Sequence, residues 1–181
     1  MEFQKTSLKD VFLIKPEVFG DNRGFFMESY SKKKFEEVGI KNDFIQDNHS
    51  KSEKKGVLRG LHFQTAPHTQ AKLVRVTKGS VYDVIVDLRK DSETFEKWEG
   101  FELSAENFLM LYVPRGFAHG FCTLEDDTEV LYKADDFYDP SSEGGLAWND
   151  PDLKINWPVD APILSERDKE WPNLKDLNNP F

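Results

Sequence analysis

The two segments beside a Lys-Gly-Ser turn, KLVRVT (72–77) and SVYDVIVDL (80–88), most constrain what this chain can fold into. In both, β-branched and other apolar residues recur at every second position, as Val74 and Val76 do after Lys72. Successive side chains of a strand point to opposite faces, so a period of two predicts strands and not helices. We therefore expect a chain built mainly from β-strands.

Further segments share this pattern: VFLIKPEVF (11–19), GFFMESY (24–30), NFLMLYVP (107–114), HGFCTL (119–124) and TEVLYKADDFY (128–138). Turn signals such as GDNRG, KGS and PRG separate them. Many short strands at regular spacing predict an all-β barrel or sandwich of the jelly-roll kind. The composition does not change along the chain, so we expect a single domain over residues 1–181.

Helical signals are few. Ser31 is a candidate N-cap for KKKFEEV (32–38), which Gly39 would end. The tail after Pro158 is rich in Pro, Asn and Asp, and its one helical candidate is SERDKEW (165–171), with Ser165 as a candidate N-cap. The sequence thus predicts a few short helices at the periphery of the β-structure.

The net charge of -9, with a pI near 5, argues against general affinity for nucleic acid or for an anionic membrane. Cys122 is the one cysteine, so no disulfide framework is expected and a reducing cytoplasm fits. The N-terminal MEFQKTSLKD lacks the apolar core of a signal peptide, and no apolar run approaches the ~20 residues of a membrane span. We expect a cytoplasmic protein without membrane or nucleic-acid partners.

Histidines near the 72–88 segment raise the possibility of a metal site. Cupin-type barrels often bind a metal through His-x-His and Glu on one segment and His in Pro-x-Gly-x-x-His on another. Pro114–His119 matches the second motif, but in the first only His62 is kept, with Gln64 at the second histidine position and Lys72 at the carboxylate position. A protonated lysine has no acceptor and repels a divalent ion. His49 and His68 are on turn-like stretches, so the sequence favours a site without a metal.

The same residues suit proton transfer. His62 is a usable general base near neutral pH, and an inward-facing Lys72 would stabilise negative charge that develops on an oxygen. Tyr132, between Val130 and Ala134 on one strand face, is a candidate general acid. Taken alone, Tyr132 is more often a packing residue, His62 is as often a hydrogen-bonded core histidine as a site residue, and Lys72 could lie on a solvent face. Their combination indicates proton abstraction next to a carbonyl, followed by proton return.

Arg59 and His62 have opposite parity in a regular strand, so both can serve one cavity only if the strand shifts phase between them. Gly60 is a natural position for a β-bulge. We predict an irregularity near Gly60.

Several motifs resemble those of one family, in the same order, from about Asp21 to Asp168. They are DNRGFFMES, QDNHSKS, GVLRGLHFQ, AKLVRVTKG, DVIVDLRKDS, VPRGFAHGF, YDPSSEGGLAWNDP and LSERD. The chain resembles the dTDP-4-dehydrorhamnose 3,5-epimerases, which are sugar-nucleotide epimerases of the cupin class without a cofactor. The resemblance implies a cupin-type jelly roll, a dTDP-linked 4-keto-6-deoxy sugar as substrate and no cofactor.

The resemblance also implies roles for individual residues. His62 would remove the protons from C3 and C5, and Asp168 would pair with it. Lys72 would hold the enolate oxygen at C4, and Tyr132 would deliver a proton from the opposite face. Tyr138 would stack on thymine, and further substrate contacts would come from Arg23, Phe26, Glu28, Gln46, Asp47, Asn48, Arg59, His119, Glu143 and Arg167.

Three details complete this interpretation. The family often has lysine where this chain has Arg167, and either cation suits a phosphate. Asp83 is a candidate to orient His119. The family is dimeric, and the Arg23–Glu28 segment is expected to reach into the neighbouring subunit's site.

We therefore expect 3,5-epimerisation of dTDP-4-dehydro-6-deoxy-D-glucose in dTDP-L-rhamnose formation. The nearest alternatives are an enzyme that inverts one carbon and a ketoisomerase on a related sugar nucleotide. More distant ones are a metal-dependent cupin oxygenase and a sugar-binding cupin without activity. A binding protein has no need of an acid–base pair, and this argues against the last.

Overall fold

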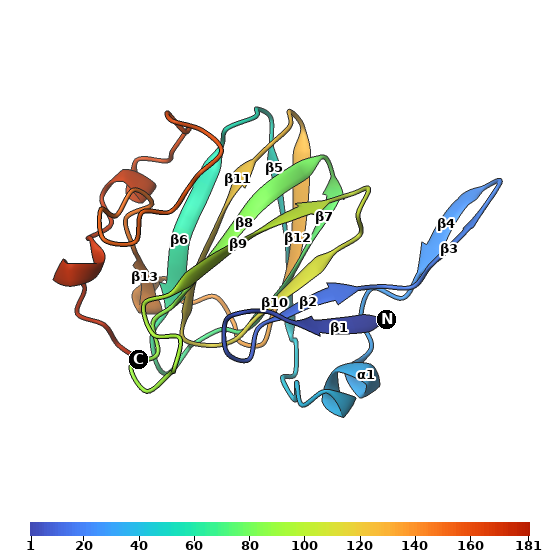
Figure 1. The fold of residues 1–181 in the computed structure, drawn as a ribbon, viewed down its shortest axis with the longest axis horizontal. Coiled ribbons are helices and arrows are strands. Elements are labelled where there is room, and N and C mark those ends of the chain that lie inside the picture. The colour runs from blue at the N-terminus through green and yellow to red at the C-terminus, as the bar shows by residue number, and fades with distance from the viewer.

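A computed structural model describes residues 1–181, and in it two antiparallel β-sheets face each other (Figure 1). The six-stranded sheet has the order β1 (Glu2–Lys5), β2 (Phe12–Lys15), β10 (Met110–Val113), β7 (Lys72–Lys78), β12 (Thr128–Ala134), β5 (Gln46–Ser52). The five-stranded sheet has the order β13 (Glu143–Gly145), β6 (Leu58–Gln64), β11 (Phe117–Thr123), β8 (Ser80–Asp87), β9 (Trp98–Ser104). This arrangement agrees with the predicted all-β jelly roll.

The main core lies between the sheets. Val74 and Val76 of β7 meet Val81 and Ile85 of β8 in one buried cluster. The alternation read from the sequence thus sorts the side chains correctly, because Leu73 packs instead in a second cluster on the outer face of the six-stranded sheet. Burying the apolar residues of both inner faces is the main stabilising term of such a sandwich.

Each outer face has its own cover. Helix α1 (Lys32–Glu37) places Phe35 against the six-stranded sheet. The C-terminal tail, with the short 3₁₀ helices η2 (Arg167–Lys169) and η3 (Leu174–Asp176), runs along the five-stranded sheet, where Leu174 and Leu177 pack (Figure 1). A further 3₁₀ turn, η1 (Pro140–Ser142), precedes β13. No helix is both long and apolar enough to cross a membrane.

The strand boundaries correct several predictions. The run 11–19 is not one strand: Pro16 lies between β2 and β3 (Val18–Asp21). The sequence pattern did not predict strands β1, β5, β9 and β13. His49 lies on β5 and not on a turn, whereas His68 does lie between strands, as expected.

The predicted helix ends are partly right. Ser31 occupies the N-cap position of α1 but makes no side-chain cap hydrogen bond, and Gly39 follows the helix with a φ of 91°. The 165–171 candidate is only the one-turn η2. The N-cap position of η2 is Glu166 and not the predicted Ser165, although the Ser165 hydroxyl accepts a hydrogen bond from the Asp168 N–H at 3.2 Å.

A two-stranded hairpin, β3 and β4 (Gly24–Met27), projects from the body of the subunit (Figure 1). Its phenylalanines are exposed, with Phe19 at 57%, Phe25 at 58% and Phe26 at 71%. Within the chain, Phe25 makes an edge-to-face contact with Phe108 at 4.9 Å. An isolated two-stranded ribbon with three exposed aromatic rings is marginally stable and exposes apolar area that a partner surface would bury.

Candidate active site

A cavity of about 480 Å³ opens between the inner faces of the two sheets. Strands β6 and β11 supply one wall, β5, β7 and β12 supply the opposite wall, and the 163–168 segment of the tail closes one side. The predicted site residues that line it are Arg59, His62, Lys72, His119, Tyr132, Tyr138, Glu143, Arg167 and Asp168. Residues far apart in the sequence are therefore brought around one space.

The predicted irregularity at Gly60 is present. Along the β6–β11 ladder His62 pairs with His119 and Arg59 with Phe121, so β6 has one residue more than β11 over this stretch. Gly60 has a φ of 122°, and a Cβ there would lie 2.6 Å from the Cα of Gly120. The bulge requires glycine, and its phase shift turns both Arg59 and His62 to the cavity.

His62 is held by the tail. Its Nε2 lies 2.5 Å from Oδ1 of Asp168, which is 4% exposed. Ser165 Oγ donates to Oδ2 of the same carboxylate at 2.8 Å, and Trp171 Nε1 approaches Oδ1 at 3.4 Å. Burial raises the pKa of Asp168, but the hydrogen bonds from His62, Ser165 and Trp171 outweigh it, and the net pKa is lowered. Asp168 is thus an ionised carboxylate that fixes the orientation of the imidazole through its contact with Nε2. Nδ1 is the other ring nitrogen of His62.

Lys72 and Tyr132 lie on the opposite wall. The Lys72 Nζ is 5.8 Å from the centre of the Tyr132 ring. Burial lowers the pKa of Lys72 to about 8, and the charges of Asp83 and Glu143 oppose this shift only in part. Burial likewise raises the pKa of Tyr132, which keeps its phenol protonated. The wall therefore presents a poorly paired cation beside a neutral hydroxyl donor.

His119 and Asp83 form a second histidine–carboxylate pair. Both oxygens of Asp83 are 3.0 Å from Nε2 of His119, and the aspartate is fully buried. Asp83 is on β8, the strand that pairs with β11 in the five-stranded sheet. The pair fixes the orientation of His119 at the back of the cavity, as predicted from the sequence.

Polar groups gather at the cavity mouth. Glu143 accepts a hydrogen bond from Arg167 Nη1 at 2.5 Å and one from the Tyr138 hydroxyl at 3.0 Å. Gln46 Oε1 accepts the backbone N–H of Tyr138 at 3.0 Å, and Gln46 Nε2 donates to Asn48 at 3.1 Å. The half-exposed Tyr138 ring is therefore held at its backbone and at its hydroxyl.

Six predicted residues do not line this cavity within the chain: Arg23, Phe26, Glu28, Gln46, Asp47 and Asn48. Arg23 and Phe26 are on the projecting hairpin, where the Arg23 side chain is 85% exposed and pairs with Asp21. Glu28 pairs with Lys34 at 2.7 Å. Asp47 is on the outer face of β5, where its carboxylate is 2.8 Å from Lys133, whereas its neighbours Gln46 and Asn48 face inward.

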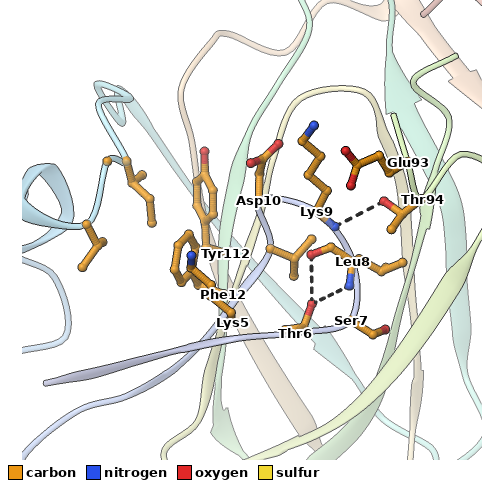
Figure 2. Close-up of a pocket in the computed structure, with 14 residues that line it drawn as sticks. Lys5, Thr6, Ser7, Leu8, Lys9, Asp10, Phe12, Glu93, Thr94 and Tyr112 are labelled. Atoms are coloured by element: carbon orange, nitrogen blue, oxygen red, sulfur yellow. Dashed lines mark hydrogen bonds between the residues drawn. The ribbon is translucent and has the colours of Figure 1, made fainter. Parts of the chain in front are cut away.

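A larger cavity of about 610 Å³ lies elsewhere, around the N-terminal loop (Figure 2). Its wall combines Lys9 and Asp10 with Glu93, Thr94 and Tyr112, and the Lys9 N–H donates to Thr94. It shares no residue with the first cavity and has no histidine. Size alone would select it, but the paired titratable groups are in the smaller cavity.

The donor set does not suit a metal ion. No group of three or more His, Cys, Asp and Glu side chains is arranged to bind one. Nε2 of both His62 and His119 is taken by a carboxylate, and Lys72 adds a nearby positive charge when protonated.

A sequence model of the family described as dTDP-4-dehydrorhamnose 3,5-epimerase matches residues 5–176. The chain belongs to this family.

Individual members of the epimerase family resemble the chain over nearly its full length. The dTDP-4-dehydrorhamnose 3,5-epimerase of Shigella flexneri is 56% identical over 169 residues, 93% of each protein. The crystal structure of the Bacillus anthracis enzyme, with TDP and PPi bound, is 52% identical with a TM-score of 0.93, covering 96% of this chain and 99% of that one. The Legionella pneumophila enzyme, in complex with dTDP-4-keto-L-rhamnose, is 44% identical with a TM-score of 0.93 and covers 98% and 94%. The cupin-type jelly roll expected from the motifs is confirmed.

Sequence reasoning missed some residues in or beside the epimerase cavity. Trp171 stands edge-on to His62, with ring centres 6.0 Å apart, and also approaches Asp168. Ser165 was read only as a helix cap, yet it holds the Asp168 carboxylate. Ser50 lines the cavity from β5. The LSERD motif contained the signal for Ser165, but no pattern marked Trp171 or Ser50.

Proposed function

We propose that the chain is a cofactor-free isomerase that converts dTDP-4-dehydro-6-deoxy-D-glucose to dTDP-4-dehydro-L-rhamnose, in the formation of dTDP-L-rhamnose. The observation that carries this is the placement of two kinds of group on opposite walls. The His62–Asp168 pair is on one side and Lys72 with Tyr132 is on the other. A sugar ring between them would have a base on one face and an acid on the other.

The chemistry uses the C4 ketone, which acidifies the protons at C3 and C5. His62 Nδ1 accepts one of these protons, and the electron pair of the C–H bond moves into an enolate with its charge on the C4 oxygen. The Asp168 carboxylate stabilises the imidazolium that forms, and the Lys72 ammonium stabilises the enolate oxygen. Tyr132 donates its proton to the opposite face of the carbon, which inverts it, and the two groups then exchange protons with solvent.

The nucleotide part would lie at the mouth. Arg59 and Arg167 are cations suited to the diphosphate, and Tyr138, which also lines the cavity, would stack on thymine. His119, Glu143, Gln46 and Asn48 supply further polar contacts. A chain with a net charge of -9 needs such a local basic cluster to bind a dianionic group.

The active unit is proposed to be a homodimer. The β3–β4 hairpin would cross to the neighbouring subunit and deliver Arg23, Phe26 and Glu28 to its cavity. The exposure of Phe19, Phe25 and Phe26 supports this, because an interface would cover them. Asp47, on the outer face of β5, would act from that face if at all. We treat residues 1–181 as one domain of a cytoplasmic enzyme with no nucleic-acid or membrane partner.

Deuterium exchange tests the proposal. The enzyme is incubated with the dTDP-linked keto sugar in D₂O, and C3 and C5 are followed by NMR. We expect deuterium at both carbons, and loss of this exchange in His62→Ala. Exchange at one carbon only would indicate the single-carbon epimerase, a changed carbonyl position a ketoisomerase, and no exchange would overturn the function. A parallel assay with a second nucleotide sugar tests the base, and metal analysis of active protein tests the oxygenase alternative.

A further inference from the structure

Gln64, the last residue of β6, makes three hydrogen bonds that all go to loop backbone. Its Nε2 donates to the carbonyl oxygens of His68, at 2.6 Å, and Phe137, at 3.1 Å. Its Oε1 accepts the N–H of Asp139 at 2.9 Å. The residue is 5% exposed and does not line the catalytic cavity. An amide so placed is fully used by the protein itself.

Two of these bonds flank Tyr138. Gln64 holds the carbonyl of the residue before it and the N–H of the residue after it, while Gln46 holds the N–H of Tyr138 itself. The ring of Tyr138 is half exposed, and its neighbour Phe137 is 61% exposed. Little apolar packing therefore fixes this segment. The glutamine side chains of Gln64 and Gln46 hold its backbone on both sides of Tyr138, while Glu143 holds the Tyr138 hydroxyl.

The chemistry of this position requires an amide. Two carbonyl oxygens and one N–H converge on it, so it must provide two donors and one acceptor from a single head group. A glutamate would offer only acceptors to the two carbonyls, and a histidine would offer one donor and one acceptor. The same position is a metal ligand in the His-x-His motif of metal cupins. Here the side chain points away from the cavity and toward the Phe137–Asp139 backbone.

We propose that Gln64 is a positioning residue for nucleotide binding: it fixes Phe137–Asp139 so that Tyr138 is preorganised against the base. The inference rests on the proposed function, in which Tyr138 stacks on the thymine of the substrate. A ring held in place before binding loses less conformational freedom when the nucleotide arrives, and this raises affinity. Gln64 touches neither the sugar nor the acid–base groups, so the chemical step does not depend on it.

The test is a double-mutant cycle between Gln64→Met and Tyr138→Ala, read out as the Kd for dTDP by calorimetry on the full chain. Methionine keeps the length of the side chain and removes all three hydrogen bonds. We expect Gln64→Met to weaken dTDP binding on the order of 10-fold and to raise KM while kcat stays within about two-fold. In the Tyr138→Ala background the same change should alter Kd less than about two-fold. Wild-type affinity in Gln64→Met, or additive effects, would overturn the inference.

Two further variants serve as a substitute and a control in this test. Gln64→Glu keeps the acceptor and loses both donors, so it should also weaken dTDP binding. It replaces Gln64→Met in the test if the methionine variant does not fold. Gln70→Met is the matched control. It removes the 2.9 Å hydrogen bond from Gln70 Nε2 to the Asp136 carbonyl, just before Phe137, but leaves the Gln64 hydrogen bonds on both sides of Tyr138. We expect it to bind like wild type, and an equal loss there would overturn the specific assignment to Gln64. Failure of the wild-type enzyme to bind dTDP would instead refute the proposed substrate.

Discussion

Nε2 of His62 lies 2.5 Å from Oδ1 of Asp168, although 106 residues separate them in the sequence. Asp168→Asn keeps the shape of this contact and removes the charge that stabilises an imidazolium. We expect deuterium exchange at C3 and C5 to slow by roughly 10²–10⁴-fold. The exposed Asp152 provides the matched control, since Asp152→Asn should exchange like wild type. Unchanged exchange in Asp168→Asn would show that the pair has no part in the chemistry.

Tyr132→Phe should separate proton removal from inversion. The variant loses only the hydroxyl, whose pKa burial raises and which therefore carries its proton at neutral pH. His62 can still remove a proton and return it to the same face, so we expect deuterium incorporation to continue while inversion slows at one carbon. NMR of the product mixture distinguishes the epimers. If both carbons invert at the wild-type rate, another group is the acid.

Lys72→Met should make the protein more stable and nearly inactive. The pKa of Lys72 is lowered from 10.5 to about 8 by burial, so the folded state holds this proton less tightly than the unfolded state. Between pH 8 and 10.5 the unfolded chain therefore binds the extra proton, and this group makes stability rise with pH. Below pH 8 both states are protonated and the folded state bears the cost of a buried charge.

Methionine removes that cost, so we expect Lys72→Met to raise the free energy of unfolding at pH 7 by roughly 1–2 kcal/mol. The rise of wild-type stability above pH 8 should become smaller in the variant, and exchange should fall roughly 10²–10³-fold. Urea denaturation at several pH values measures the first two effects. A variant less stable than wild type at pH 7 would mean that Lys72 is well paired in the folded state.

Part of this site could be predicted from local pattern. The period of two between Lys72 and Leu88 sorted inner from outer residues correctly, and the parity of Arg59 and His62 required the bulge at Gly60. The sequence pattern did not predict strand β5, because this strand is polar on both faces. Gln46 and Asn48 face polar groups of the site, and the other face is exposed. A strand without an apolar face has no periodic signal.

The tail could not be predicted in this way. Its residues have no regular period, and the position of Asp168 beside His62 depends on how η2 docks on β6, which no local rule determines. Only the LSERD motif indicated it, through resemblance to the family. Asp47 shows the converse limit, because a motif match placed it at the substrate while the strand's alternation turns its side chain to Lys133.

Gly60→Ala should unfold much of the site. An added Cβ would lie 2.6 Å from the Gly120 Cα and 2.8 Å from the His119 carbonyl oxygen, both backbone atoms that cannot rotate away. We expect a loss of stability of roughly 3 kcal/mol or more, from overpacking added to the strain at positive φ. Gly39→Ala is the matched control, since Gly39 also has a positive φ but no atom within 4 Å of the new Cβ. That variant should lose only about 1 kcal/mol, and equal losses in urea denaturation would contradict the steric argument.

If the β3–β4 hairpin serves the neighbouring subunit, two inactive variants should complement each other in a mixed dimer. Phe26→Ala combined with Arg23→Ala impairs the hairpin, and His62→Ala impairs the base. If the hairpin serves the neighbouring subunit, a mixed dimer has one site with both defects and one with none. Random mixing of equal amounts then restores about one quarter of the wild-type sites.

Unfolding and refolding the two variants together, followed by the deuterium exchange assay, measures this recovery. Each variant refolded alone is the control and should stay inactive. If the hairpin serves its own subunit, every site in a mixed dimer has one defect and no activity returns. If sedimentation analysis shows a monomer, the hairpin cannot serve a neighbouring subunit. The exposed Phe19, Phe25 and Phe26 would then have no partner surface to cover them.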